Sequence, residues 1–175
     1  MKSNIKLICF LFLLALGLSS CFVKRFHSEK GHKWVETFFA SDKGMLYFVK
    51  PILFQESESN KLIADFSFKY KDEWKDSAIM NFTFYSNMPI KSLDSIKITA
   101  KDRVTTFPIS SHLFSEKYHN SIANRFSVSI PQTYFKKMID ASTISINLYY
   151  PSKVEQYKSS DKAVKAFNYL SKNIL

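Results

Sequence analysis

Residues 62–71 read LIADFSFKYK, and residues 78–85 read AIMNFTFY. In both stretches apolar and polar residues alternate, so an extended chain would have one apolar face and one polar face. The polar residues 72–76 between them, which include Trp74, predict a hairpin turn. The two stretches therefore predict neighbouring antiparallel strands that pack against a core on one side only.

The same alternation along the rest of the chain predicts a mainly β fold. Further strands are expected at 45–54 (interrupted by Pro51), 95–101, 103–109, 122–130 and 142–150. Several one-sided strands at short spacing favour an antiparallel β-sandwich, Ig-like or similar.

Two helices are expected among these strands. Segment 131–141 begins with a proline, which suits the first turn of a helix, and predicts a short connector helix. The C-terminal helix should begin near Ser160, because Ser159-Ser160-Asp161 offers good N-cap chemistry. Beyond it Ala163, Phe167, Leu170 and Ile174 follow helical spacing, with lysines opposite. This amphipathic helix either closes an edge or face of the sheet or binds a partner or a membrane surface.

The N-terminus has the order of a secretory signal. Lys2 and Lys6 precede an apolar run over residues 7–18, and two small residues, Ser19 and Ser20, precede Cys21. The run is too short to cross a hydrocarbon core of about 30 Å, which needs roughly 20 apolar residues. A cleaved signal is therefore favoured over a permanent transmembrane helix.

Leu18-Ser19-Ser20-Cys21 resembles the lipobox of bacterial lipoproteins. The resemblance covers only this segment, and the alternative is an ordinary signal peptide. It implies transfer of diacylglycerol to the Cys21 thiol, cleavage between Ser20 and Cys21, and usually acylation of the new N-terminus. Two or three acyl chains hold a protein on a membrane far better than the marginal grip of one.

Three segments follow from this interpretation: a signal peptide (1–20), a lipidated basic tether (21–33) and a single β-rich globular domain (34–175). Without Lys2 and Lys6 the formal net charge falls from +10 to +8. Nucleic acid is not the expected partner of an exported chain. Lipid headgroups, an anionic glycan or an envelope protein are expected instead. Four cations lie in the tether, namely Lys24, Arg25, Lys30 and Lys33.

The cell envelope is the expected location. Phe22 follows the lipidated cysteine, where the best-known inner-membrane retention signal would place an aspartate. In a cell with an outer membrane, we therefore expect the protein on that membrane, facing the periplasm.

Two residue types are scarce enough to exclude classes of chemistry. Cys9 leaves with the signal, so the mature chain has only Cys21 and no cysteine nucleophile, disulfide or thiolate metal site. It retains only Gly31 and Gly44, whereas phosphate-binding loops and nucleophile elbows need several glycines. No cofactor is expected.

No catalytic or metal site stands out among the remaining polar residues. His112 and His119, with Glu116 between them in an expected loop, are a weak zinc pattern. A triad of Ser110 or Ser111 with His112 and Asp102 has no geometric support. Acid pairs of the kind a glycosidase needs, Glu56/Glu58 and Asp72/Glu73, are expected in solvated turns.

Trp74 is the one aromatic residue that the expected core does not explain. The chain contains 17 Phe and 9 Tyr, and most of them fit the strand alternation. An exposed tryptophan in a hairpin turn stacks on a sugar, enters a membrane interface, or folds back onto the sheet.

The sequence therefore favours a membrane-anchored envelope lipoprotein with a non-enzymatic binding or assembly role. The alternatives are a hydrolase acting on cell-wall or other glycan polymers and a carrier with an apolar ligand cavity.

Overall fold

The computed structural model describes residues 32–39, 44–55, 60–70, 77–150 and 153–175. All of them fall within the unit Gly31–Leu175. Ser20, Cys21 and Trp74 lie outside the described residues, as do most of the tether and the turn 72–76.

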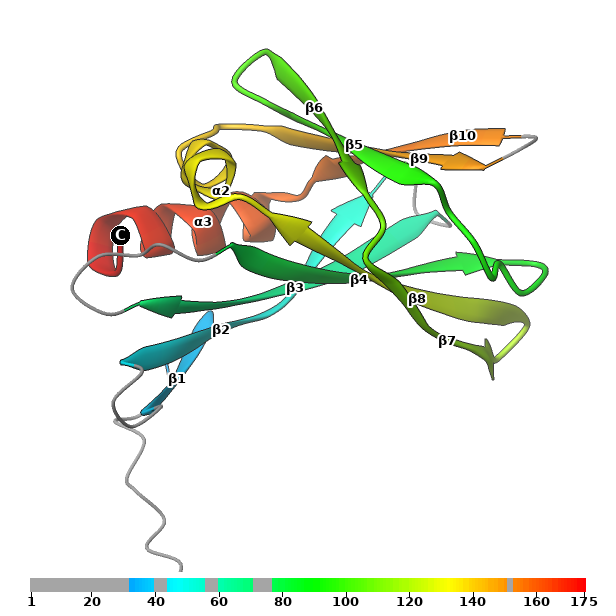
Figure 1. Cartoon of the computed structure of the whole chain (residues 1–175), viewed down its shortest axis with the longest axis horizontal. Coiled ribbons are helices and arrows are strands. Elements are labelled where there is room, and N and C mark those ends of the chain that lie inside the picture. Colours follow the sequence, from blue (N-terminus) through cyan, green and yellow to red (C-terminus); the bar gives the residue numbers. More distant parts are fainter. Residues whose placement is uncertain (1–31, 40–43, 56–59, 71–76, 151–152) are drawn as a thin grey trace, which may run out of the picture. The chain divides into compact units, whose positions relative to one another are not determined.

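The described residues form ten strands and two helices, which confirms a mainly β, antiparallel fold with a connector helix and a C-terminal helix (Figure 1). The strands are β1 (Val35–Phe39), β2 (Met45–Gln55), β3 (Lys61–Tyr70), β4 (Ala78–Ser86), β5 (Ser95–Ala100), β6 (Arg103–Pro108), β7 (Ser111–Tyr118), β8 (Ser121–Ile130), β9 (Ile144–Tyr150) and β10 (Lys153–Ser159). The helices are α2 (Gln132–Ile139) and α3 (Asp161–Asn173).

All ten strands belong to one curled sheet that forms a half-barrel. Their order is β6-β5-β9-β10-β2-β3-β4-β8-β7, and β1 pairs with β2 beside this path. The expected sandwich of two separate sheets is not confirmed, because β10 and β2 join the two halves through the pairs Lys158↔Gln55 and Ser159↔Phe54. At the other side, β6 leads directly through Ile109 and Ser110 into β7, so one stretch of chain crosses between the halves.

The interruption expected at Pro51 is a shift of register within β2. The pairing of β2 with β3 slips between Val49 and Ile52. On its other side β2 pairs with β1 up to Val49 and with β10 only from Phe54 onward. Pro51, which has no N–H to donate, thus lies where β2 changes neighbours and needs no ladder hydrogen bond there.

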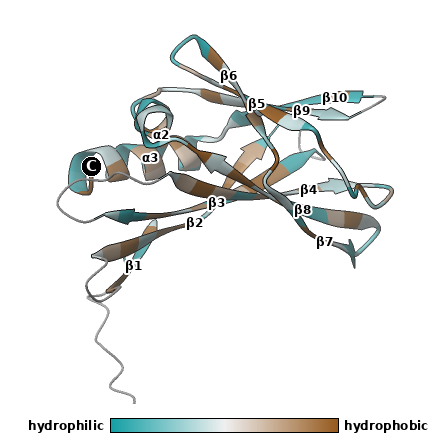
Figure 2. Ribbon diagram, viewed as in Figure 1, coloured by the Kyte–Doolittle hydropathy of each residue, from teal (hydrophilic) through white to brown (hydrophobic). Residues whose placement is uncertain are grey.

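The core lies between the halves of the sheet and the two helices. Figure 2 shows hydrophobic residues, in brown, alternating with hydrophilic ones along the strands. On α2, Phe135 packs on Phe66 and Phe68, with ring centroids 5.3 and 5.5 Å apart. On α3, Phe167 meets Phe66 edge-on at 5.7 Å. These inward residues are almost completely buried, so helices and sheet together fill the interior around them.

The N-cap of α3 agrees with the sequence, whereas α2 has a different start. Ser160 Oγ accepts a hydrogen bond from the Ala163 amide at 3.3 Å and satisfies one of the free donors of the first turn. Pro131 is the N-cap residue of α2 rather than part of the helix, and no side chain caps that end. Neither described helix is both long enough and apolar enough to cross a membrane.

Three strands were missed in the sequence: β1, β7 and β10. The segment expected as a loop around His112 is strand β7, and seven of its eight residues are exposed, so no apolar alternation marks it. In β10 the buried positions are Glu155 and Tyr157, which read as polar rather than as a core-facing stripe. Solvent exposure thus explains why β7 has no apolar alternation, and buried polar residues explain it for β10.

Candidate functional site

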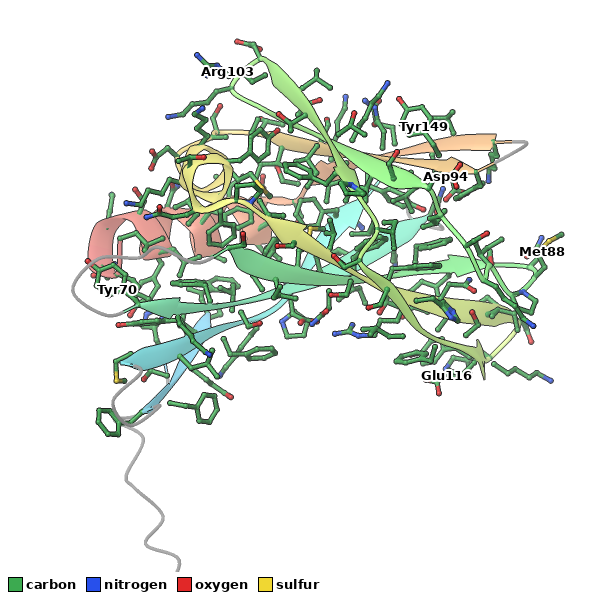
Figure 3. The ribbon with its side chains drawn as sticks, in the orientation of Figure 1. Tyr70, Met88, Asp94, Arg103, Glu116 and Tyr149 are labelled. Carbon is green, nitrogen blue, oxygen red and sulfur yellow. The ribbon has the colours of Figure 1, made fainter. Side chains whose placement is uncertain are left out.

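Two hollows lie at the end of β4, and Tyr85, Ser86 and Asn87 line both of them. We call the hollow that Tyr118 lines the outer hollow; its volume is about 560 Å³. We call the hollow that Glu155 lines the inner hollow; its volume is about 460 Å³. The outer hollow is also lined by Lys61, Ile63, Tyr118, His119, Asn120 and Ser121. The inner hollow is also lined by Asn60, Met88, Ile90, Tyr150, Lys153 and Glu155. Met88 marks this end of the sheet in Figure 3.

The outer hollow combines aromatic rings with amide and hydroxyl groups. Tyr85 and Tyr118, from β4 and the end of β7, have ring centroids 5.4 Å apart, and Tyr118 is 51% exposed. The His119 ring meets Tyr118 edge-on at 4.6 Å, on a turn whose backbone is left-handed at His119 (φ 51°). Burial, and then the neighbouring Tyr118, raise the pKa of Tyr85, so its hydroxyl stays protonated and can donate a hydrogen bond.

The charge of the outer hollow is one-sided. Lys61 supplies a cation, and no aspartate or glutamate is among the lining residues. An anionic group that entered this hollow would meet a lysine, two amide side chains and tyrosine hydroxyls without repulsion from a lining carboxylate.

The inner hollow contains a buried carboxylate that is already bonded. Glu155 is 4% exposed, and its two oxygens accept hydrogen bonds from Lys153 Nζ and from the Tyr157 hydroxyl. Burial alone raises the pKa of this carboxyl. The hydrogen bonds from Lys153, Tyr150 and Tyr157, with the lysine charge, outweigh burial, so the pKa lies below its usual 4.5. Glu155 is therefore an ionised, internally satisfied group.

Asn124 of β8 holds the rim between the hollows in place. Its side chain is completely buried, and its Oδ1 accepts hydrogen bonds from the Ile90 amide at 2.7 Å and from Ser115 Oγ at 2.8 Å. Its Nδ2 donates to Ser86 Oγ at 2.8 Å and to the Ile122 carbonyl at 3.1 Å. One amide thus ties the turn after β4 to the neighbouring strands.

Stacked aromatic rings lie behind the inner hollow. Tyr150, which lines it, stacks on Phe84 with centroids 5.9 Å apart, and Phe84 stacks on Phe126 at 6.0 Å. Phe84 and Phe126 are fully buried, so they support Tyr150 from the core side.

A second polar network crosses β3, β4 and β8 on the opposite face of the sheet from the core. Asp65, which is 2% exposed, accepts hydrogen bonds from Arg125 Nη2 and, at 3.1 Å, from Asn81 Nδ2. Arg125 Nη1 also donates to Thr83 Oγ1 at 2.9 Å. The donors and acceptors satisfy one another, so we interpret this network as a clamp between three strands.

The histidines that the sequence singled out do not come together as a site. His112 Nε2 lies 2.9 Å from Ser115 Oγ, whereas His119 lines the outer hollow. Within the described ranges, no three His, Cys, Asp or Glu residues are grouped to hold a metal ion. For the triad considered above, His112 Nε2 pairs with Ser115 rather than with Ser110 or Ser111. Asp102 lies in the turn between β5 and β6.

Of the residues that line the two hollows, only His119 belongs to a candidate site pattern singled out from the sequence. A signal was present: Tyr85-Ser86-Asn87 and Tyr118-His119-Asn120 both place a tyrosine two residues before an asparagine where a strand ends. Both acid pairs considered above, Glu56/Glu58 and Asp72/Glu73, lie outside the described residues.

Comparison with protein-family models, with curated proteins and with solved structures found no match to the chain.

Proposed function

We propose that the chain is a lipid-anchored envelope protein that binds an acidic glycan in the outer hollow without cleaving it. The observation that carries the proposal is the lining of that hollow. Tyrosine rings can stack on the apolar faces of sugar rings, while amides and hydroxyls can bond to sugar hydroxyls. Lys61, with no carboxylate beside it in the lining, favours a glycan that carries acidic groups.

The state of Glu155 supports binding rather than hydrolysis. A glycosidase uses two carboxyl groups that face one cleft, and its general acid has a raised pKa. Glu155 is the only carboxylate among the residues that line the two hollows, and its pKa is lowered by its own lysine and tyrosine partners. An ionised group with this environment would be a poor proton donor.

The location in this proposal comes from the sequence. The lipobox-like Leu18-Ser19-Ser20-Cys21 would receive acyl chains on Cys21, and Phe22 favours the outer membrane in a cell that has one. A glycan of the envelope would then be within reach of the domain. The ligand carrier considered above would need an unfilled apolar cavity inside the domain. The interior is instead packed with aromatic side chains, and the two hollows lie at the surface.

The test is calorimetric titration of the acylated protein in detergent micelles with oligosaccharides of hexuronic acid, and with neutral dextran of matched length. We expect binding of the acidic oligosaccharide only, weakened by salt. Tyr118→Ala should lower the affinity about tenfold, as expected for loss of one ring contact. Lys61→Ala should weaken binding and flatten its salt dependence.

Val104→Ala is the matched control, because Val104 is 61% exposed on β6, away from the hollow-lining residues. It should leave the affinity unchanged. Equal affinity of wild type and the Lys61 and Tyr118 variants would contradict the site, and release of shortened oligosaccharides would show a hydrolase instead.

A further inference from the structure

The end of the sheet opposite the two hollows exposes aromatic side chains. Phe38 is 51% exposed and Phe39 is 70% exposed, both at the end of β1. In register, Phe38, Leu46 and Lys69 form one row across β1, β2 and β3. We call Phe38, Phe39 and Leu46 the β1 tip. Figure 2 shows apolar residues on β1 and β2 at this end.

The described part of the chain has two pairs of consecutive exposed large hydrophobic residues, Leu113 with Phe114 and Phe38 with Phe39, and the pair at the β1 tip is the more exposed. Phe39 has the largest exposed fraction of the large hydrophobic side chains there, and Phe38 adjoins it. Phe38 and Phe39 are consecutive in the strand, so their rings point to opposite sides of its end and leave apolar surface on both. Exposed apolar surface of this kind marks contact with another apolar phase, either a protein or a membrane. Phenylalanine has no polar atom in its side chain, so it gains nothing from facing water.

The segment before β1 indicates that this apolar phase is a membrane rather than a protein. Cys21, the predicted lipid attachment site, precedes Val35, the first residue of β1, by only fourteen positions. Even a fully extended segment of that length reaches no more than about 50 Å. It carries Lys24, Arg25, Lys30 and Lys33, which would be attracted to anionic headgroups. A bilayer that holds Cys21 is therefore within reach of the β1 tip.

We infer that the β1 tip enters the interface of the membrane that anchors the chain. This inference rests on the anchor in the proposed function but not on the glycan. Tyr70 pairs with Met45, and Met45 pairs with Phe39, so this end of β3 lies beside the tip.

This contact would hold the outer hollow away from the bilayer. Lys61, which lines the hollow, and Tyr70, beside the tip, are the two ends of β3. A strand of this length, at about 3.3 Å per residue, separates its ends by about 30 Å. Figure 3 shows Tyr70 and Met88 at opposite ends of the domain's strands.

The test uses fluorescent labels on single cysteines, since Cys9 leaves with the signal and acylation blocks Cys21. Lys69→Cys puts a label beside the tip and keeps both phenylalanines, and Asn120→Cys puts one at the outer hollow. Each acylated variant is placed in vesicles of phosphatidylethanolamine and phosphatidylglycerol that contain doxyl-labelled lipids. We expect the label at 69 to lose most of its fluorescence and the label at 120 to keep it.

A second pair of variants tests the rings themselves. In the Lys69→Cys protein, Phe38→Ser with Phe39→Ser should restore the fluorescence, whereas Val104→Ser, an equally exposed apolar position on β6, should not. Equal quenching at 69 and 120, or quenching that survives loss of both rings, would overturn the contact while leaving the anchor in place. Protein that does not float with the vesicles and has no acyl mass would overturn both the anchor and the contact, whatever the result of the glycan titration in detergent.

Discussion

Glu155 occupies a core-facing position of β10 that would ordinarily carry an apolar residue. A buried carboxylate is costly unless it is paired and fully hydrogen-bonded. Here Lys153 and Tyr157 donate to its two oxygens, and Lys153 extends outward, with its side chain 60% exposed. The arrangement brings charge to the mouth of the inner hollow without leaving a bare carboxylate in the core.

The lowered pKa of Glu155 predicts how stability depends on pH. The folded protein favours the ionised form, so this contribution is complete above the unfolded pKa of about 4.5 and is lost as the pH falls through the lower folded value. Glu155→Gln should cost about 1–3 kcal/mol at neutral pH, because Lys153 and Tyr157 lose a charged acceptor. The difference between wild type and variant should shrink as the pH falls below 4.5.

Urea unfolding followed by circular dichroism, repeated from neutral to acidic pH, would measure this difference. Glu116→Gln is the control, because Glu116 is an exposed carboxylate on β7. It should give a difference of less than about 0.5 kcal/mol at neutral pH, as expected for an exposed surface substitution. A difference for Glu155→Gln that stays constant below pH 4.5 would contradict the role assigned to its carboxylate.

Helix α3 depends on one aromatic residue for its place on the sheet. Phe167 is fully buried and contacts Phe66 of β3, whereas its neighbour Asn168 is exposed. Phe167→Ala should lower the free energy of unfolding by about 3–5 kcal/mol, since it leaves a cavity between helix and sheet. Asn168→Ala should change it by less than about 0.5 kcal/mol. Similar urea midpoints for the two variants would show that α3 is not part of the cooperative core.

The elements differ in how far the sequence predicts them. β3, β4 and β8 alternate apolar and polar residues because one face of each packs on the core. β7 is almost wholly exposed and β10 buries Glu155 and Tyr157, so neither has an apolar stripe to recognise. Local periodicity reports burial of apolar residues. It therefore identifies strands that supply the core and misses strands that pair at its edge or carry buried polar groups.

At the scale of the whole molecule, the pairing of distant segments was beyond the reach of local patterns. A sandwich and a single curled sheet contain the same one-sided strands. The difference lies in the short contact between β10 and β2 and in the direct passage from β6 to β7. The hollows depend on the same long-range assembly, because Lys61, Tyr85 and Tyr118 belong to different strands and meet only after the sheet has formed.

The proposed anchor rests on local sequence alone, so it can be tested without the fold. Lipid transfer needs a thiol after small residues at the end of the signal, which only Cys21 provides. Cys21→Ala should abolish palmitate labelling, leave the signal uncleaved and release or mislocalise the protein. Cys9→Ala changes the other cysteine, within the signal's apolar run, and should preserve labelling and membrane fractionation. If the Cys21 variant were labelled as strongly as wild type, the lipobox interpretation would be wrong, and the orientation inferred for the β1 tip would lose its basis.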